Sequence, residues 1–112
     1  MDCIFCAISE GKIPASKVYE DDLILAFLDI APQAPVHIVV IPKAHIASSD
    51  GINVENSAQI ARIFELVPKI ARDAGCKNGY RVITNCGPDA RQTVSHLHFH
   101  ILGGVRLPDR LA

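Results

Sequence analysis

The chain has 112 residues, of which 49% are hydrophobic and 21% are charged, and its formal net charge is −1. This length and composition predict a single domain, residues 1–112, with its own core. Proteins that bind nucleic acid usually carry a basic patch or stripe, so the near-neutral charge argues against a nucleic-acid partner. No signal peptide is expected, and no apolar stretch reaches the roughly 20 residues of a membrane helix, so we expect a soluble, cytoplasmic protein without a membrane partner.

The first half of the chain predicts a short helix and three strands. Pro14 ends an initial segment that we expect to be helical over residues 4–10. Residues 17–20 and 23–28 predict two strands, and the link Asp21-Asp22 between them suits a tight hairpin. Residues 36–41 are β-branched and bracketed by prolines, which makes them the clearest strand.

The second half predicts one long helix and two strands. Apolar residues recur at spacings of three and four over residues 53–74, which is typical of an amphipathic helix, and Gly75 suits its C-terminal cap. Pro68 lies inside this pattern, so we expect a kink or a break near residue 64. Residues 80–85 and 94–102 predict strands, with a loop over 86–93. The order predicts an α+β fold: an antiparallel sheet with its helices mainly on one side.

The most distinctive motif is His96-Leu97-His98-Phe99-His100. On a strand, alternation points all three imidazoles to one face and the two apolar side chains to the other. Chance enrichment on a solvated face and a metal site are the alternatives. Adjacent histidines would lie about 6.7 Å apart and the outer pair about 13 Å apart, so the three cannot share one ion on a regular strand.

An imidazole that binds no metal is suited to phosphoryl chemistry. Near pH 7 it is largely neutral and has a lone pair that can attack phosphorus, which splits one displacement into two easier steps. Neighbouring histidines can bind phosphate oxygens and protonate the leaving group. The preceding loop offers backbone N–H groups and the polar side chains of Gln92 and Thr93.

The motif and its flanks resemble the histidine triad (HIT) family, and within it the histidine-triad nucleotide-binding (HINT) branch. The similarity extends over nearly the whole chain, in the segments 13–15, 19–22, 26–30, 32–35, His37, 41–43, 45–46, 79–81 and 92–94. It implies a HIT-like antiparallel sheet with one long helix and a short N-terminal helix. It also implies a homodimer in which two protomers form a continuous sheet.

The resemblance further implies an enzyme that cleaves the P–N bond of purine nucleoside phosphoramidates, with an AMP- or GMP-like ligand and no cofactor required for catalysis. His98 would attack the α-phosphorus, and water would then cleave the nucleotidyl-histidine to a nucleoside monophosphate. His100 and Thr93 would help protonate the leaving group. His96 would support the site, and His37 would orient the nucleophile. A dinucleoside polyphosphate hydrolase and a nucleotide-binding regulatory module with incidental catalysis are the alternatives.

The same resemblance assigns a nucleotide pocket. Asp29 would accept hydrogen bonds from the ribose hydroxyls, and Asn85 would hold ribose or phosphate. The other expected contacts are Phe5, Ile8, Phe27, Ile30, Arg91, Gln92, Thr93, Val94, His98 and His100. Simpler roles stay open: turn residues at Asp29 and Asn85, and plain core packing at Phe5, Phe27 and His37.

Some positions depart from the family pattern. Arg91 stands where the HINT loop usually has glycine, so it either reaches phosphate or alters the loop if that position needs positive φ. Thr93 replaces the commoner serine. The tail, residues 105–112, lacks the Trp-Pro-Pro ending of many relatives. His100 stands where nucleotidyltransferase branches have glutamine, which favours hydrolysis over transfer.

Cys3 and Cys6 form a C-x-x-C, which is half of a common structural zinc set. By resemblance to some bacterial relatives, His45 and His96 would complete a Cys₂His₂ structural zinc site that pins the N-terminus and leaves His98 free. Two unligated thiols are the alternative. Four cysteines do not form a secreted disulfide pattern, and the other two are expected to be plain small residues.

Overall fold

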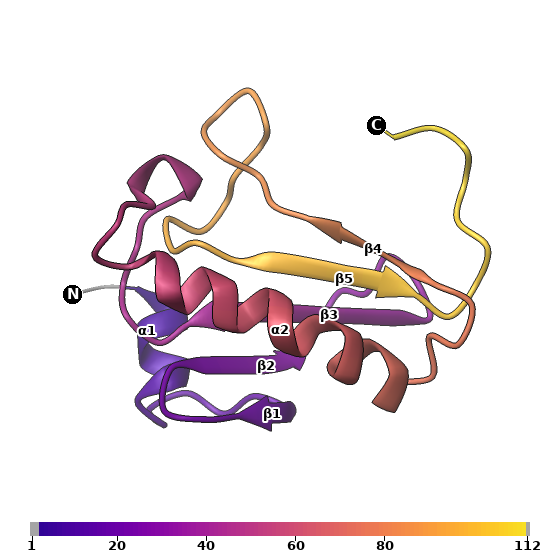
Figure 1. Cartoon of the computed structure of the whole chain (residues 1–112), viewed down its shortest axis with the longest axis horizontal. Coiled ribbons are helices and arrows are strands. Elements are labelled where there is room, and N and C mark those ends of the chain that lie inside the picture. The colour runs from indigo at the N-terminus through magenta and orange to yellow at the C-terminus, as the bar shows by residue number, and fades with distance from the viewer. Residues whose placement is uncertain (1–2, 112) are drawn as a thin grey trace.

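The computed structural model describes residues 3–111, which form a five-stranded antiparallel sheet and two α-helices (Figure 1). In chain order the elements are α1 (Ile4–Ser9), β1 (Lys17–Glu20), β2 (Ile24–Leu28), β3 (Val36–Pro42), the 3₁₀ helix η1 (Ser49–Gly51), α2 (Ser57–Asp73), β4 (Tyr80–Ile83) and β5 (Phe99–Gly103). The strand order is β1-β2-β3-β5-β4, and all neighbours are antiparallel. This confirms the predicted α+β fold with one long and one short helix.

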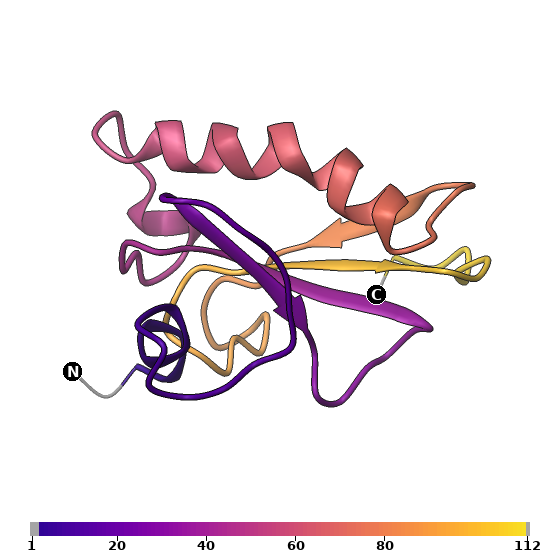
Figure 2. The same ribbon diagram turned by 90° about the horizontal axis from the view of Figure 1, so that it is seen from below.

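The two helices lie on opposite faces of the sheet (Figure 2). On one face, Ile63 and Val67 of α2 belong to the same buried cluster as Ile38 of β3. On the other face, Ile8 of α1 belongs to a smaller cluster with Val39 of β3. We expected the helices mainly on one side, but β3 presents apolar side chains to both faces, and each face therefore needs a cover.

The long helix α2 differs from its prediction at two places. It begins at Ser57 and not at residue 53, because the side-chain carbonyl of Asn56 accepts the N–H of Asn53 at 2.9 Å and closes a separate turn. The predicted break is absent, since α2 continues through Pro68, although its axis bends toward the sheet in its C-terminal half (Figure 2). Gly75 follows with a φ of 102°, as a C-terminal cap requires. Neither described helix has the length and hydropathy to cross a membrane.

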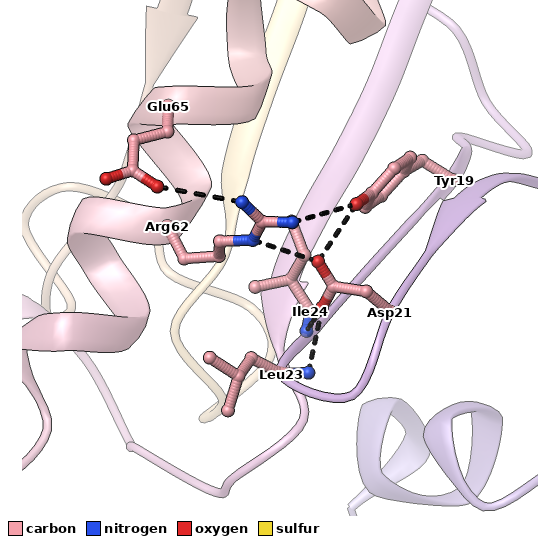
Figure 3. Close-up of polar contacts among 6 residues, drawn as sticks. All are labelled: Tyr19, Asp21, Leu23, Ile24, Arg62 and Glu65. Atoms are coloured by element: carbon pink, nitrogen blue, oxygen red, sulfur yellow. Dashed lines mark hydrogen bonds and ion pairs between the residues drawn. The ribbon is translucent and has the colours of Figure 1, made fainter.

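Arg62 ties α2 to the turn between β1 and β2 (Figure 3). Its guanidinium donates to Asp21 Oδ2 at 3.0 Å and to the Tyr19 hydroxyl at 3.3 Å. The other carboxylate oxygen of Asp21 accepts the N–H groups of Leu23 and Ile24 at 2.8 and 2.9 Å, which closes the predicted hairpin. Burial acts to raise the pKa of Asp21, but these hydrogen bonds outweigh it and lower the pKa to about 2.

The last strand is shorter than predicted, since β5 begins at Phe99 and not at residue 94; β4 likewise ends at residue 83 and not at 85. Val40 of β3 is paired with Phe99, and beyond it the strand reaches Pro42, which has no N–H to extend the ladder. The N–H of Leu97 donates instead to the carbonyl of Ile46 at 2.6 Å.

The alternation of histidine and apolar residues nevertheless persists. Leu97 and Phe99 belong to the core beneath α2. His100 is paired with Val39, whose side chain belongs to the opposite cluster, so the imidazole of His100 lies on the α1 face. The segment 84–98 passes on this same side of the sheet (Figure 2). The histidine motif and α1 are therefore brought to one face.

Candidate active site

His98 is buried and is held by a hydrogen bond to its own backbone segment. Its Nδ1 lies 2.7 Å from the carbonyl oxygen of His96, and a carbonyl can only accept, so Nδ1 carries the proton. The lone pair of a neutral His98 is therefore on Nε2. The ring packs edge-on against Phe5 and against His100, with centroids 5.1 Å apart in each pair. The geometry gives His98 a fixed tautomer with one nitrogen free to act as a nucleophile or ligand.

His37 and His100 form a second chain of hydrogen bonds. The backbone N–H of Gln33 donates to His37 Nδ1 at 3.0 Å, so the proton of a neutral His37 is on Nε2. That Nε2 lies 2.8 Å from His100 Nδ1 and 3.3 Å from Asp29 Oδ2. Because His100 Nδ1 accepts this proton, a neutral His100 carries its own proton on Nε2. His37 thus contacts His100, which in turn packs against His98.

Burial favours the uncharged form of three imidazoles, those of His37, His96 and His100. It lowers the pKa of His37, against the opposing charge of Asp29. It also lowers the pKa of His100, helped by the neighbouring His98 and His37. Burial likewise lowers the pKa of His96, although a bond to the Pro42 carbonyl opposes it. Near neutral pH these three side chains therefore serve as hydrogen-bond donors and acceptors and not as fixed cations.

A cavity of about 590 Å³ is lined by two residues that contact the histidines, since Phe5 packs against His98 and Asp29 lies 3.3 Å from His37; no histidine is itself part of the lining. Its walls come from α1, the 13–16 segment, β2 and β3, and are mostly apolar, a composition that suits a flat aromatic ligand. The lining includes four residues that were predicted to contact the nucleotide, together with the aspartate that was predicted to bind the ribose hydroxyls: Phe5, Ile8, Phe27, Ile30 and Asp29. Phe5 and Phe27 meet edge to face with centroids 5.6 Å apart. Asp29 accepts the N–H of Ala31 through Oδ1 at 2.8 Å.

The loop before the motif is braced by Gln92. Its Oε1 accepts the N–H of Gly87 at 3.0 Å, and its Nε2 donates to the carbonyls of Ala47 and Val94 at 2.8 and 2.9 Å. In the structure this side chain shapes the loop, and contact with a nucleotide remains a prediction. The same holds for Val94 and Asn85, which are half-buried, and for the exposed Thr93.

Arg91 has a φ of 62°, the one positive value at a non-glycine residue among residues 3–111. An L-residue in this region is strained by about 1–2 kcal/mol relative to a right-handed conformation. The position is therefore one that glycine would occupy more easily, and the side chain of Arg91 is exposed.

Cys3, Cys6, His45 and His96 converge, with one donor atom of each lying within 4.8 Å of the others. Cys3 Sγ is 3.4 Å from His96 Nδ1, and Cys6 Sγ is 3.3 Å from His45 Nδ1 and 3.6 Å from His96 Nδ1. His96 Nε2 donates to the carbonyl of Pro42 at 2.8 Å, which leaves the Nδ1 lone pair directed at the sulfurs. Burial and the neighbouring Cys3 raise the pKa of the Cys6 thiol to about 11.

Within residues 3–111 two groups of side chains have the composition of a metal site, but in only one of them can every member offer a lone pair to an ion. Asp29, His37 and His100 also lie within 4.8 Å of one another. The Gln33 N–H occupies one nitrogen of His37, and a proton occupies the other, so His37 has no lone pair for an ion. The cysteine–histidine cluster has no such obstacle. The hydrogen bond from the backbone N–H of Gln33 to His37 is a contact within the candidate site that side-chain patterns in the sequence could not reveal.

A family model described as HIT domain matches residues 10–107, a range that begins after α1. A HIT-like protein of Synechococcus elongatus is 52% identical over 106 residues, which are 95% of this chain and 93% of that protein. The structure of a HIT family hydrolase from Clostridium thermocellum superposes with a TM-score of 0.96 at 45% identity, covering 99% of this chain and 97% of that one. A histidine triad protein from Clostridium difficile gives 0.93 at 50% identity, with 98% and 96% covered.

Proposed function

The chain belongs to the HIT family, and from this premise we propose that it is a nucleotide hydrolase that cleaves the P–N bond of purine nucleoside phosphoramidates. The observation that carries the proposal is the 2.7 Å hydrogen bond from His98 Nδ1 to the His96 carbonyl. It leaves a free lone pair on Nε2 of the buried His98, and Phe5, which packs against His98, lines a cavity large enough for a nucleoside.

In the proposed first step, His98 Nε2 attacks the α-phosphorus and the P–N bond breaks. The bonding electron pair leaves with the amine nitrogen, which takes up a proton. His100 carries a proton on Nε2 because its Nδ1 accepts a hydrogen bond from His37. We propose that His100 donates hydrogen bonds to the phosphate oxygens and, together with the Thr93 hydroxyl, helps to protonate the leaving amine. In the second step water attacks phosphorus and the bond from phosphorus to His98 Nε2 breaks. One proton of the water returns to His100 and replaces the proton given to the amine, so the nucleoside monophosphate is released and both histidines are neutral again.

The cavity supports a purine nucleotide as the ligand. The rings of Phe5 and Phe27 offer apolar and aromatic surface to a base, and Asp29 at the cavity offers carboxylate oxygens to two ribose hydroxyls. The site needs no cofactor for this reaction, because the nucleophile and the proton donor are both side chains.

We further propose a structural zinc ion at Cys3, Cys6, His45 and His96. A tetrahedral zinc site with bonds of about 2.0–2.3 Å separates its ligand atoms by roughly 3.3–3.8 Å. The three separations of 3.3, 3.4 and 3.6 Å within the cluster match this range. The ion would hold the N-terminal segment against the sheet and would leave His98, which is not a ligand, free to react.

The edge strand β4 and its exposed apolar neighbours support the proposal of a homodimer with a continuous sheet. β4 is an edge of the sheet within the described residues, so its outer hydrogen-bonding groups are free to pair. Phe64 on α2 and Tyr80 on β4 are exposed by 49% and 38%, which gives a second copy apolar surface to cover.

A cytoplasmic location suits the free thiols, because a reducing compartment would preserve them.

Mass spectrometry of enzyme quenched during turnover tests the mechanism. An adenosine phosphoramidate should leave one adenylyl group on a peptide that spans residues 92–106, at His98. The alternative of a dinucleoside polyphosphate hydrolase predicts faster turnover of a diadenosine polyphosphate in the same assay. A regulatory module predicts AMP binding without measurable turnover of either compound. An adenylyl group on a residue other than His98 would overturn the assignment of the nucleophile.

A further inference from the structure

We propose that metal binding at the cysteine–histidine cluster docks α1 and thereby sets the affinity of the nucleotide pocket. The inference rests on the proposed function for the identity of the ligand. It goes beyond a structural zinc ion because it makes one wall of the binding site dependent on the metal.

α1 is too short to be stable without external support. It has six residues, whereas an isolated helix needs about 12–15 residues to be stable in water. Ile8 is its one buried residue, whereas Ile4 is exposed by 49%. The first turn is held at Cys3 and Cys6, through contacts of sulfur with His96 and His45. Thiols are weak hydrogen-bond donors, so these contacts alone hold α1 weakly, and metal–thiolate bonds would hold it far more firmly.

The other half of the cluster is fixed independently of α1. His96 is fully buried and donates to the carbonyl of Pro42 at the end of β3. His45 is followed by Ile46, whose carbonyl accepts the N–H of Leu97. Two ligands therefore lie in segments that adjoin β3 and β5, and the other two lie at the start of a short helix. A metal ion would join the first pair to the second.

Phe5 links the docked helix to the active site. It lies between the two cysteines in the sequence, and its ring lines the cavity. The ring also packs edge-on against His98, His96 and Phe27, with centroids 5.1, 5.9 and 5.6 Å away. If α1 undocks, the cavity loses the wall that Phe5 and Ile8 provide, and the nucleophile loses a packing partner. The nucleotide would then bind only to the docked fraction of molecules.

The test compares full-length protein loaded with Zn²⁺, stripped with a chelator, and reloaded. Peptide-resolved hydrogen exchange over residues 3–16 reports on α1 without reference to catalysis, and calorimetric titration with AMP reports on the pocket. His45→Ala removes one ligand without altering α1, and His45→Cys restores a metal ligand at the same position. Cys86→Ser is the matched control, because Cys86 is a free thiol outside the cluster.

Removal of zinc, or the substitution His45→Ala, should raise exchange in α1 selectively while α2 and the sheet remain protected. It should weaken AMP binding about tenfold or more, which corresponds to a docked fraction of about one tenth or less. His45→Cys and Cys86→Ser should bind zinc and AMP like the parent. The proposal is overturned if zinc does not bind, or if the stripped protein shows unchanged exchange in α1. If loaded protein does not bind AMP, the proposed function fails, and the exchange measurement still decides whether the metal docks α1.

Discussion

His98 donates the proton of its Nδ1 to the carbonyl of His96, the residue two positions before it, at 2.7 Å. The acceptor is a backbone atom, so the tautomer of His98 does not depend on any side chain of the motif. The side chain of His96 is instead directed to Pro42 and to the two sulfurs. His96 thus fixes the proposed nucleophile through its carbonyl and contributes to the cysteine–histidine cluster through its ring.

The substitution His98→Ala should reduce turnover of an adenosine phosphoramidate by about 10³-fold or more, because the covalent route is lost. AMP affinity should change by only a few-fold, since Phe5, Phe27 and Asp29 still line the cavity. Steady-state kinetics and calorimetry measure the two quantities. Turnover equal to that of the parent would contradict a nucleophilic role for His98.

The pair His37→Gln and His37→Leu tests the proton chain that ends at His100. A glutamine Nε2–H can still donate to His100 Nδ1, whereas leucine cannot. Only the leucine variant should therefore allow His100 to carry its proton on either ring nitrogen. We expect a loss of kcat of about 10²-fold in His37→Leu and a smaller loss in His37→Gln, in line with general acid catalysis. The ¹⁵N chemical shifts of His100 should show protonation at Nε2 in the parent and a mixture in His37→Leu. The same tautomer in both variants would refute the positioning role.

The lowered pKa values of His37 and His100 predict a loss of stability in mild acid. The folded-state pKa lies below the unfolded value of 6.5, so the unfolded chain binds protons first as the pH falls. This contribution is complete above pH 6.5 and decreases as the pH falls from 6.5 through the folded-state pKa. Urea denaturation between pH 8 and pH 5 measures it, and His37→Gln should show a shallower decrease than the parent. Equal slopes would contradict the prediction.

Asp21 predicts a second, more acidic transition. Its pKa of about 2 lies below the value of 3.8 for an unperturbed aspartate, so its contribution to stability is complete above pH 3.8 and is lost as the pH falls through 2. We expect it to stabilise the fold by about 1–2 kcal/mol, after allowance for solvent screening of a partly exposed side chain. Asp21→Asn should remove this dependence and should loosen the contact with Arg62. Thermal melts from pH 5 to pH 2 provide the measurement, with Asp22→Asn as the control.

Arg91→Gly should stabilise the protein, because glycine adopts the observed φ of 62° without strain. We expect a gain of about 0.5–1 kcal/mol after the greater chain entropy of glycine in the unfolded state is included. Arg91→Ala removes the same guanidinium but keeps the strain, so it separates the backbone effect from any phosphate contact. If Arg91→Gly is no more stable than Arg91→Ala, strain at this position does not matter. A lower kcat/KM shared by both variants would indicate that the guanidinium contacts the substrate.

Patterns that depend on neighbouring residues could be predicted from the sequence. The alternation in residues 96–100, the period of α2 and the hairpin at Asp21-Asp22 each follow from local backbone geometry. The structure confirms the alternation, the helix and the hairpin, although His96 and His98 precede β5 and not the regular strand that the spacing argument assumed. It places His96 with the cysteines and His100 with His37.

Only the tertiary structure decided where β5 begins, which proton each imidazole carries, and which face α1 covers. The strand starts at Phe99 because the neighbouring strand ends in Pro42, which lacks a donor there. The tautomers follow from the carbonyl of His96 and the N–H of Gln33, backbone atoms that every residue possesses and whose partners depend on the fold. A sequence shows which side chains can donate, accept or ligate, but the assignment of each proton requires the positions of all neighbouring atoms at once.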